Sequence, residues 1–166
     1  MNNDANFMKD PADHVLAVIH DALGDTYHYV NGLMDNEIPV SLIPLVMASI
    51  TDGDITAGAS GQDDIAEELT IIIAINKKDY VGGKDDIDES DLALRRIVMG
   101  VDPNTREYLP NTVMYAIRKN FTLEGGVVEN RIRFDFQAQQ RGENLYTQEV
   151  MLTLNVGRMV QVPSRN

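Results

Sequence analysis

The most regular pattern of apolar and polar positions lies in the second half of the chain. From residue 130 to 139 the apolar side chains Ile132, Phe134 and Phe136 alternate with charged or amide side chains, and residues 149–156 alternate in the same way. Period two over eight or more residues is typical of a half-buried strand. Residues 140–144 between the runs are polar and contain one glycine, so the pattern predicts a β-hairpin over residues 130–156.

Helical spacing marks two other segments. After Asp10, which suits an N-cap, and Pro11, which suits the first helical position, apolar residues follow at intervals of three and four as far as Gly24. Ser90 is the expected cap of a second helix over residues 91–99. Both helices are amphipathic, so we expect them to pack on a sheet.

Three further segments complete the expected order. Residues 67–78 contain three consecutive isoleucines and predict a central strand covered on both faces, and the two prolines in residues 38–47 favour an edge or irregular strand. Residues 51–64 are rich in Gly, Asp and Ser, which predicts a mobile loop. Residues 112–123 alternate and predict a strand before the hairpin.

These elements predict an α+β fold. We expect an antiparallel or mixed sheet of four to five strands, two helices packed on one face, and long acidic loops. A length of 166 residues suits one domain. We divide the chain into a flexible N-terminal tail (1–9), a single domain (10–156) and a C-terminal arm (157–166).

Composition removes several function classes. The chain has no cysteine, which excludes disulfides, thiol nucleophiles and cysteine-bound metal centres. No apolar run reaches the roughly 18 to 20 residues that span a bilayer, and the polar start lacks the pattern of a signal peptide. We therefore expect no membrane association, and a protein that is made and used inside a cell.

The net charge of −12 is divided unevenly along the chain. Residues 1–94 hold four Lys/Arg and 19 Asp/Glu, a net of −15, whereas residues 95–166 hold ten and seven, a net of +3. The acidic half argues against tight nucleic-acid binding. Either acidic loops keep the protein soluble, or acidic and basic parts meet between subunits. For the second interpretation the candidate subunit interface comprises Arg95, Arg96, Arg131, Arg133 and Arg141.

No motif for catalysis or cofactor binding is present. The sequence contains no Gly-rich phosphate loop and no Gly-x-Ser-x-Gly elbow, and its three histidines lack metal-ligand spacing. Asp52-Gly53-Asp54 suggests calcium, but the spacing of an EF-hand loop is absent. We therefore expect no enzyme, no cofactor and no metal site.

The order of elements resembles the tail terminator proteins of long-tailed bacteriophages, and more loosely other small neck and tail-completion proteins. The resemblance rests on the first helix ending at Leu23-Gly24, the proline-containing strand at 38–47 and the glycine- and aspartate-rich loop before the strand at 67–78. It also rests on the helix at 90–99 and the closing hairpin. It extends over residues 10–156 as a pattern, without a short diagnostic motif. The loop at 51–64 and the segment after Val156 depart from it.

The resemblance implies a homohexameric ring in the virion, assembled in the host cytoplasm. Such a ring caps the last ring of tail tube protein, joins it to a neck or head–tail connector protein, and lets DNA pass without specific binding. Asp52, Asp54, Asp63 and Asp64 are then the candidate acidic loop that faces the lumen or a partner. The alternatives are a head–tail stopper or adaptor of the neck and, from another class, a small-ligand-binding α+β domain. A fourth hypothesis is an enzyme with an acidic site.

Overall fold

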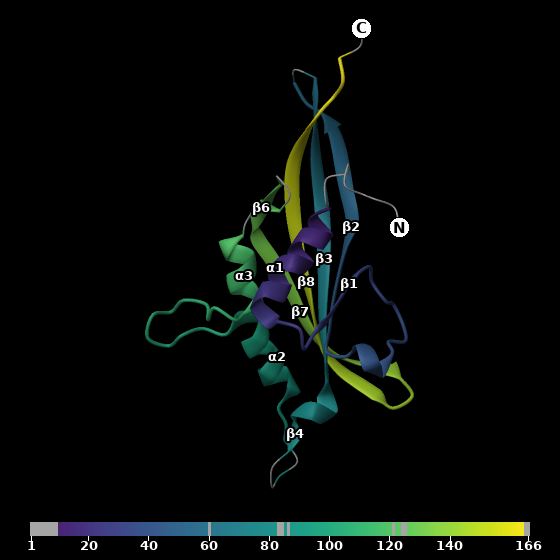
Figure 1. Ribbon diagram of the computed structural model, residues 1–166, viewed down its shortest axis with the longest axis vertical. Helices are drawn as coiled ribbons and strands as arrows, with labels where there is room; N and C mark the ends of the chain where they lie inside the picture. Colours follow the sequence, from purple (N-terminus) through teal and green to yellow (C-terminus); the bar gives the residue numbers. More distant parts are fainter. Residues whose placement is uncertain are drawn as a thin grey trace.

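The computed structural model describes residues 10–59, 61–82, 85, 87–120, 122–123 and 126–164 (Figure 1). The expected tail at 1–9 lies outside these residues. In chain order the elements are α1 (Pro11–Leu23), β1 (His28–Asn31), η2 (Val40–Leu42), β2 (Leu45–Ala57), β3 (Gln62–Asn76), η3 (Lys77–Tyr80), β4 (Val81–Gly82), β5 (Ile87–Asp88), α2 (Ser90–Met99), α3 (Val113–Lys119), β6 (Thr122–Leu123), β7 (Gly126–Gly142) and β8 (Leu145–Gln161).

One mixed sheet organises the described residues. Its strand order is β1-β2-β3-β8-β7-β6, and β4 and β5 pair separately. β1 is parallel to β2, whereas the other pairings are antiparallel. Five longer strands form the sheet, and the two-residue β6 extends one edge. The predicted α+β class with a sheet of four to five strands is confirmed.

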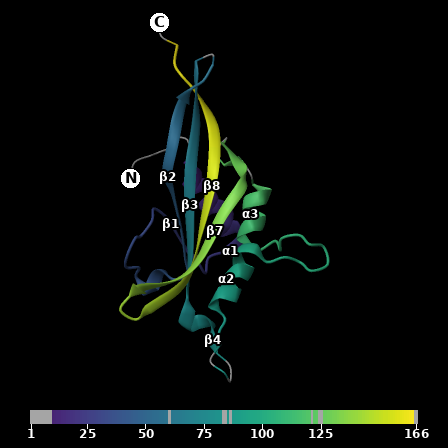
Figure 2. The same cartoon turned by 180° about the vertical axis from the view of Figure 1, so that it is seen from behind.

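Helices α1, α2 and α3 cover one face of the sheet, which we call the helix face (Figures 1 and 2). Ile19 of α1, Leu94 of α2 and Ile117 of α3 pack with Ile71 and Ile73 of β3 in one buried cluster. The opposite face, which we call the open face, carries Ile72, so the isoleucine run does supply both faces of a central strand, as predicted.

The start and end of α1 follow the sequence signals. The Asp10 Oδ1 atom accepts a hydrogen bond of 2.9 Å from the Asp13 backbone N–H, which satisfies a donor that the first helical turn leaves unpaired. Gly24 ends the helix with a positive φ of 78°, and its N–H bonds to the carbonyl of His20. Within the described residues no helix is long and apolar enough to cross a membrane.

A second, smaller core lies on the open face at one end of the sheet. Ile38 packs there with Leu45 and Met47 of β2, and residues 33–43 provide most of the surrounding apolar side chains. The proline-containing segment is therefore only partly a strand: a short 3-10 helix, η2, precedes β2, which begins after Pro44.

The prediction of a strand at 112–123 is wrong for residues 113–119, which form the helix α3, and of the described residues in this range only Thr122–Leu123 form a strand, β6. In the described part of the chain three helices therefore pack on the sheet, and not the expected two. Thr112 caps the helix α3, because its Oγ1 atom accepts a hydrogen bond of 3.3 Å from the Tyr115 N–H. Val113, Met114 and Ile117 are buried together, which is the spacing of one helix face. The alternation of Val113, Tyr115 and Ile117 fits a strand equally well, and packing against α1 decided for the helix.

The prediction of a mobile loop at 51–64 is also wrong. Residues 52–57 of β2 pair with 63–68 of β3, which in turn pair with β8. We call residues 52–57, 62–68 and 155–161 the arm; it extends beyond the helices to one end of the molecule in Figure 1. β8 continues to Gln161, so residues 157–161 of the expected C-terminal arm belong to the sheet. Polar residues that bury little can form a strand where neighbouring strands supply the backbone hydrogen bonds.

Two boundaries differ slightly from expectation. The β7–β8 connection contains only Glu143 and Asn144, because β7 extends to Gly142 and β8 begins at Leu145. Ser90 is the first residue of α2 and not its cap; its backbone N–H donates to the Asp88 Oδ1 atom at 2.9 Å.

Candidate functional site

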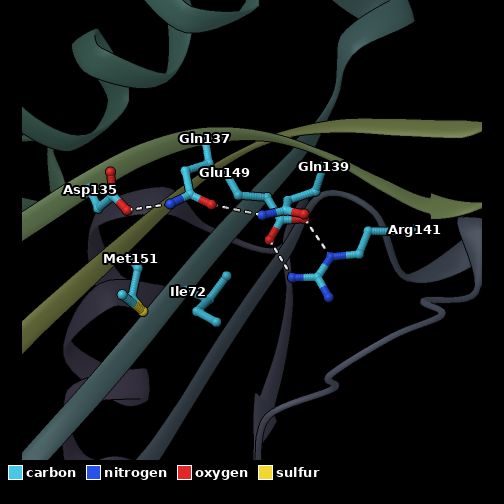
Figure 3. Close-up of a pocket in the computed structure, with 7 residues that line it drawn as sticks. All are labelled: Ile72, Asp135, Gln137, Gln139, Arg141, Glu149 and Met151. Carbon is cyan, nitrogen blue, oxygen red and sulfur yellow. Dashed lines mark hydrogen bonds and ion pairs between the residues drawn. The ribbon is translucent and has the colours of Figure 1, made fainter.

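A ladder of polar side chains follows β7 along the open face (Figure 3). Gln139 donates a hydrogen bond of 2.9 Å to Gln137 Oε1, and Gln137 donates to a carboxylate oxygen of Asp135. The three residues are two positions apart, so strand geometry places them in one row. Each amide uses one donor within the row and offers further donors and acceptors to the surface.

Arg141 and Glu149 form a buried ion pair at the end of this row (Figure 3). Glu149 accepts hydrogen bonds of 2.7 and 2.6 Å from Arg141 Nε and Nη2, and Thr147 Oγ1 donates to Glu149 Oε2 at 2.5 Å. Arg141 Nη1 donates to the carbonyl of Asp35 at 2.8 Å and lies 3.3 Å from those of Met34 and Asn36. Hydrogen bonding to Glu149 raises the pKa of Arg141.

Arg141 therefore joins the end of the hairpin to residues 34–36 of its own chain. Its side chain retains only 10% exposure, and that of Glu149 retains 6%. The prediction that Arg141 is exposed on the polar face of the hairpin is therefore wrong. From sequence it shares the polar parity of Arg133, and its burial comes from the bulge between Gln140 and Gly142 and from the cover of residues 34–36.

The hollow beside this pair is small, and both polar and apolar side chains line it. Its lining residues are Ile72, Asp135, Gln137, Gln139, Arg141, Glu149 and Met151 (Figure 3). Its volume of about 160 Å³ is well below the roughly 300–1,000 Å³ of typical small-molecule pockets. The arrangement suits contact with a surface better than enclosure of a ligand.

The other four predicted arginines separate into two pairs. Arg95 and Arg96 lie on α2; Arg95 Nε is 2.9 Å from Asp91 Oδ2, and its guanidinium lies 4.4 Å from the centre of the Phe136 ring. Arg131 and Arg133 are exposed side by side on β7, near the edge of the sheet. Arg133 Nη2 lies 4.0 Å from Glu68 Oε2, a distance at which an exposed pair contributes little.

The predicted acidic residues all lie on the arm, in paired strands and not in a loop. The register places Asp52, Asp54 and Asp64 on the open face and Asp63 on the helix face. Residues 49–69 contain six carboxylates and no Lys or Arg. Arg158 Nε, from β8, lies 2.8 Å from the Glu67 Oε1 atom on the helix face of the arm.

Two exposed apolar side chains were given no functional role from the sequence, and one of them, Phe134, was expected to be buried. Ile55 on the arm is 71% exposed, and Phe134 on β7 is 54% exposed. Both lie on the helix face, Ile55 on the arm and Phe134 on the outer strand β7. An isolated isoleucine within a polar run was the only signal for Ile55, whereas the alternation around Phe134 predicted burial.

The remaining candidate chemistry is sparse. Within the described residues no group of three or more His, Asp or Glu side chains could hold a metal ion. His20 Nε2 lies 2.6 Å from Asp25 Oδ1 at the end of α1, and its ring meets that of Tyr29 edge to face.

No protein-family model matches the sequence, and no curated protein matches it either.

Proposed function

We propose that this chain is a structural subunit that assembles into a ring. Its place would be that of a tail terminator: the ring caps the tail tube of a long-tailed phage, joins it to the neck and lets DNA pass. The assignment to this family rests on the resemblance of the element order, and the proposal of self-assembly rests on the structure.

The observation that carries the proposal is the separation of opposite charges onto two exposed edges of one sheet. The arm presents Asp52 and Asp54 on β2, and Arg131 and Arg133 lie on β7. β3 and β8 separate these strands, so the two surfaces point to different neighbours. Two different complementary surfaces on one chain favour a head-to-tail contact, which gives rings when the rotation closes.

The charge of the arm also supports a channel for DNA. Phosphate groups bind where Lys and Arg neutralise them, and each such contact must be released before DNA can slide. Asp52, Asp54 and Asp64, which are exposed on the open face of the arm, would repel the duplex wherever they face the lumen.

Native mass spectrometry of the purified chain tests the ring. We expect a closed species of six subunits, and negative-stain images of rings on the ends of tail tubes when tube protein is added. A chain that stays monomeric at all concentrations and does not bind tubes contradicts the proposal. A chain that is monomeric alone but forms rings on a head–tail connector favours the stopper or adaptor instead.

A further inference from the structure

The two outer sides of the sheet are only partly paired. β1 pairs with residues 45–48 of β2, and β6 pairs with residues 126–127 of β7. Among the described residues, no strand pairs with the outer side of β2 from 49 to 57 or of β7 from 128 to 140. Within the described residues, one carbonyl of that β7 stretch accepts a hydrogen bond from a helix side chain: Arg118 of α3 donates to the Asn130 carbonyl. Unpaired backbone groups on an edge strand are a template for pairing with another chain.

We propose that the free edge of β2 pairs with the free edge of β7 from a second copy of this chain, so that the sheet continues from subunit to subunit. Three antiparallel pairings separate the two strands, so β2 and β7 run in opposite directions. A second copy with its open face on the same side therefore meets β7 as an antiparallel neighbour, the arrangement that already joins most of this sheet.

The side chains on the open face are complementary across this contact. Asp52 and Asp54 stand on the open face of β2, and Arg133 stands on the open face of β7 with Arg131 beside it. Adjacent strands that share a face bring such residues within reach as cross-strand pairs. Asp135 follows in the same row, but its carboxylate already accepts a hydrogen bond from Gln137.

The side chains on the helix face are complementary as well. Ile55 of β2 and Phe134 of β7 are large, apolar and exposed, and both lie on the helix face. Next to Ile55 a hollow of about 450 Å³ opens on the arm, with Gly53, Ile65 and Glu67 among its lining residues. In the proposed contact the aromatic ring of the second copy's Phe134 would enter this hollow, and both apolar side chains would leave water.

β1 limits where the second copy can lie. It occupies the side of β2 at residues 45–48, so the new strand must run along residues 49–57, toward the tip of the arm. Beyond the bulge near Ile50, residues 52–57 are regularly paired with β3 and present one straight edge. The contact is therefore staggered and heterologous, as a closing ring requires.

This inference rests on the proposed self-assembly, but it can fail separately. Because the chain lacks cysteine, introduced cysteines report contacts cleanly. The register that places Asp54 opposite Arg133 and Gly53 opposite Phe134 also places Ile55 opposite Ile132, so Ile55→Cys combined with Ile132→Cys should form disulfide-linked ladders under mild oxidation, whereas each single variant should stop at dimers. Within one chain β2 and β7 are separated by three strand spacings of about 4.8 Å, or about 14 Å, too far for a disulfide.

The register is found by a small panel. Ile55→Cys combined with Phe134→Cys or Phe136→Cys covers registers shifted by two and four residues on the same face. If rings of six form but no member of the panel gives ladders, the edge pairing is overturned and the ring stands. If the chain never oligomerises, both the proposed ring and the proposed edge pairing are contradicted.

Charge reversal provides an independent test. Arg133→Glu and Asp54→Arg should each weaken assembly about tenfold, because an attractive cross-strand pair becomes a repulsive one, and the double variant should recover most of the loss. Lys78→Glu, at an exposed lysine after β3 and outside both edges, is the matched control and should assemble normally. Equal weakening by the control, or no recovery in the double variant, would contradict the contact.

Discussion

Arg141 and Glu149 face each other across the β7–β8 hairpin and share hydrogen bonds of 2.7 and 2.6 Å. The pair is almost fully removed from solvent, and Arg141 also binds the carbonyls of residues 34–36. It fastens the segment that covers the small second core to the end of the hairpin, opposite the arm. The ion pair thus lies on the same face of the sheet as Asp54 and Arg133 of the proposed subunit contact, but in a different part of that face.

Removing either member of this pair should destabilise the fold strongly. Arg141→Met or Glu149→Leu alone leaves a buried charge without its partner, which costs about 3–5 kcal/mol. The double variant should lose much less, because no lone charge remains. Denaturant unfolding measures the free energy of unfolding for all three variants, and additive losses would show that the two residues do not act as a pair.

The arm should depend on a glycine that approaches another strand closely. A Cβ at Gly53 would lie 2.7 Å from the Ala66 carbonyl oxygen, so Gly53→Ala should cost about 1–3 kcal/mol and raise amide exchange across the arm. Gly157→Ala is the matched control on the same arm, because no atom lies within 4 Å of its Cβ. We expect the control to be neutral or slightly stabilising. Equal effects of both changes would contradict the steric explanation.

Stability should fall in acid partly through Asp88. A hydrogen bond from Lys77, aided by those from Ser90, lowers the pKa of Asp88 from 3.8 to about 2. A lowered folded-state pKa contributes stability above the unfolded pKa, and this contribution is lost as the pH falls from about 4 to about 2. Asp88→Asn should flatten the fall in unfolding free energy over that window. Asp79→Asn, at a nearby exposed carboxylate, serves as the control, and an unchanged slope in Asp88→Asn would contradict the assignment.

Local patterns determined much of the fold in advance. The capped helix α1, the central strand with its isoleucine run and the closing hairpin could each be predicted, because helix capping and period-two burial depend on neighbours a few residues apart. The same patterns indicated an α+β class and singled out Arg131 and Arg133 on the polar side of the hairpin.

What the sequence by itself did not determine depended on contacts between distant segments. Residues 52–57 became a strand because β3 supplies their hydrogen-bond partners, and residues 113–119 became a helix because α1 packs against them. Arg141 and Arg133 both fall on the polar positions of the alternating run, yet residues 34–36 cover Arg141, whereas Arg133 is exposed. Strand order places Asp52 and Asp54 near one edge of the sheet and Arg131 and Arg133 near the other. Alternation along a strand determines which face a side chain lies on, whereas only strand pairing determines which edge it lies near.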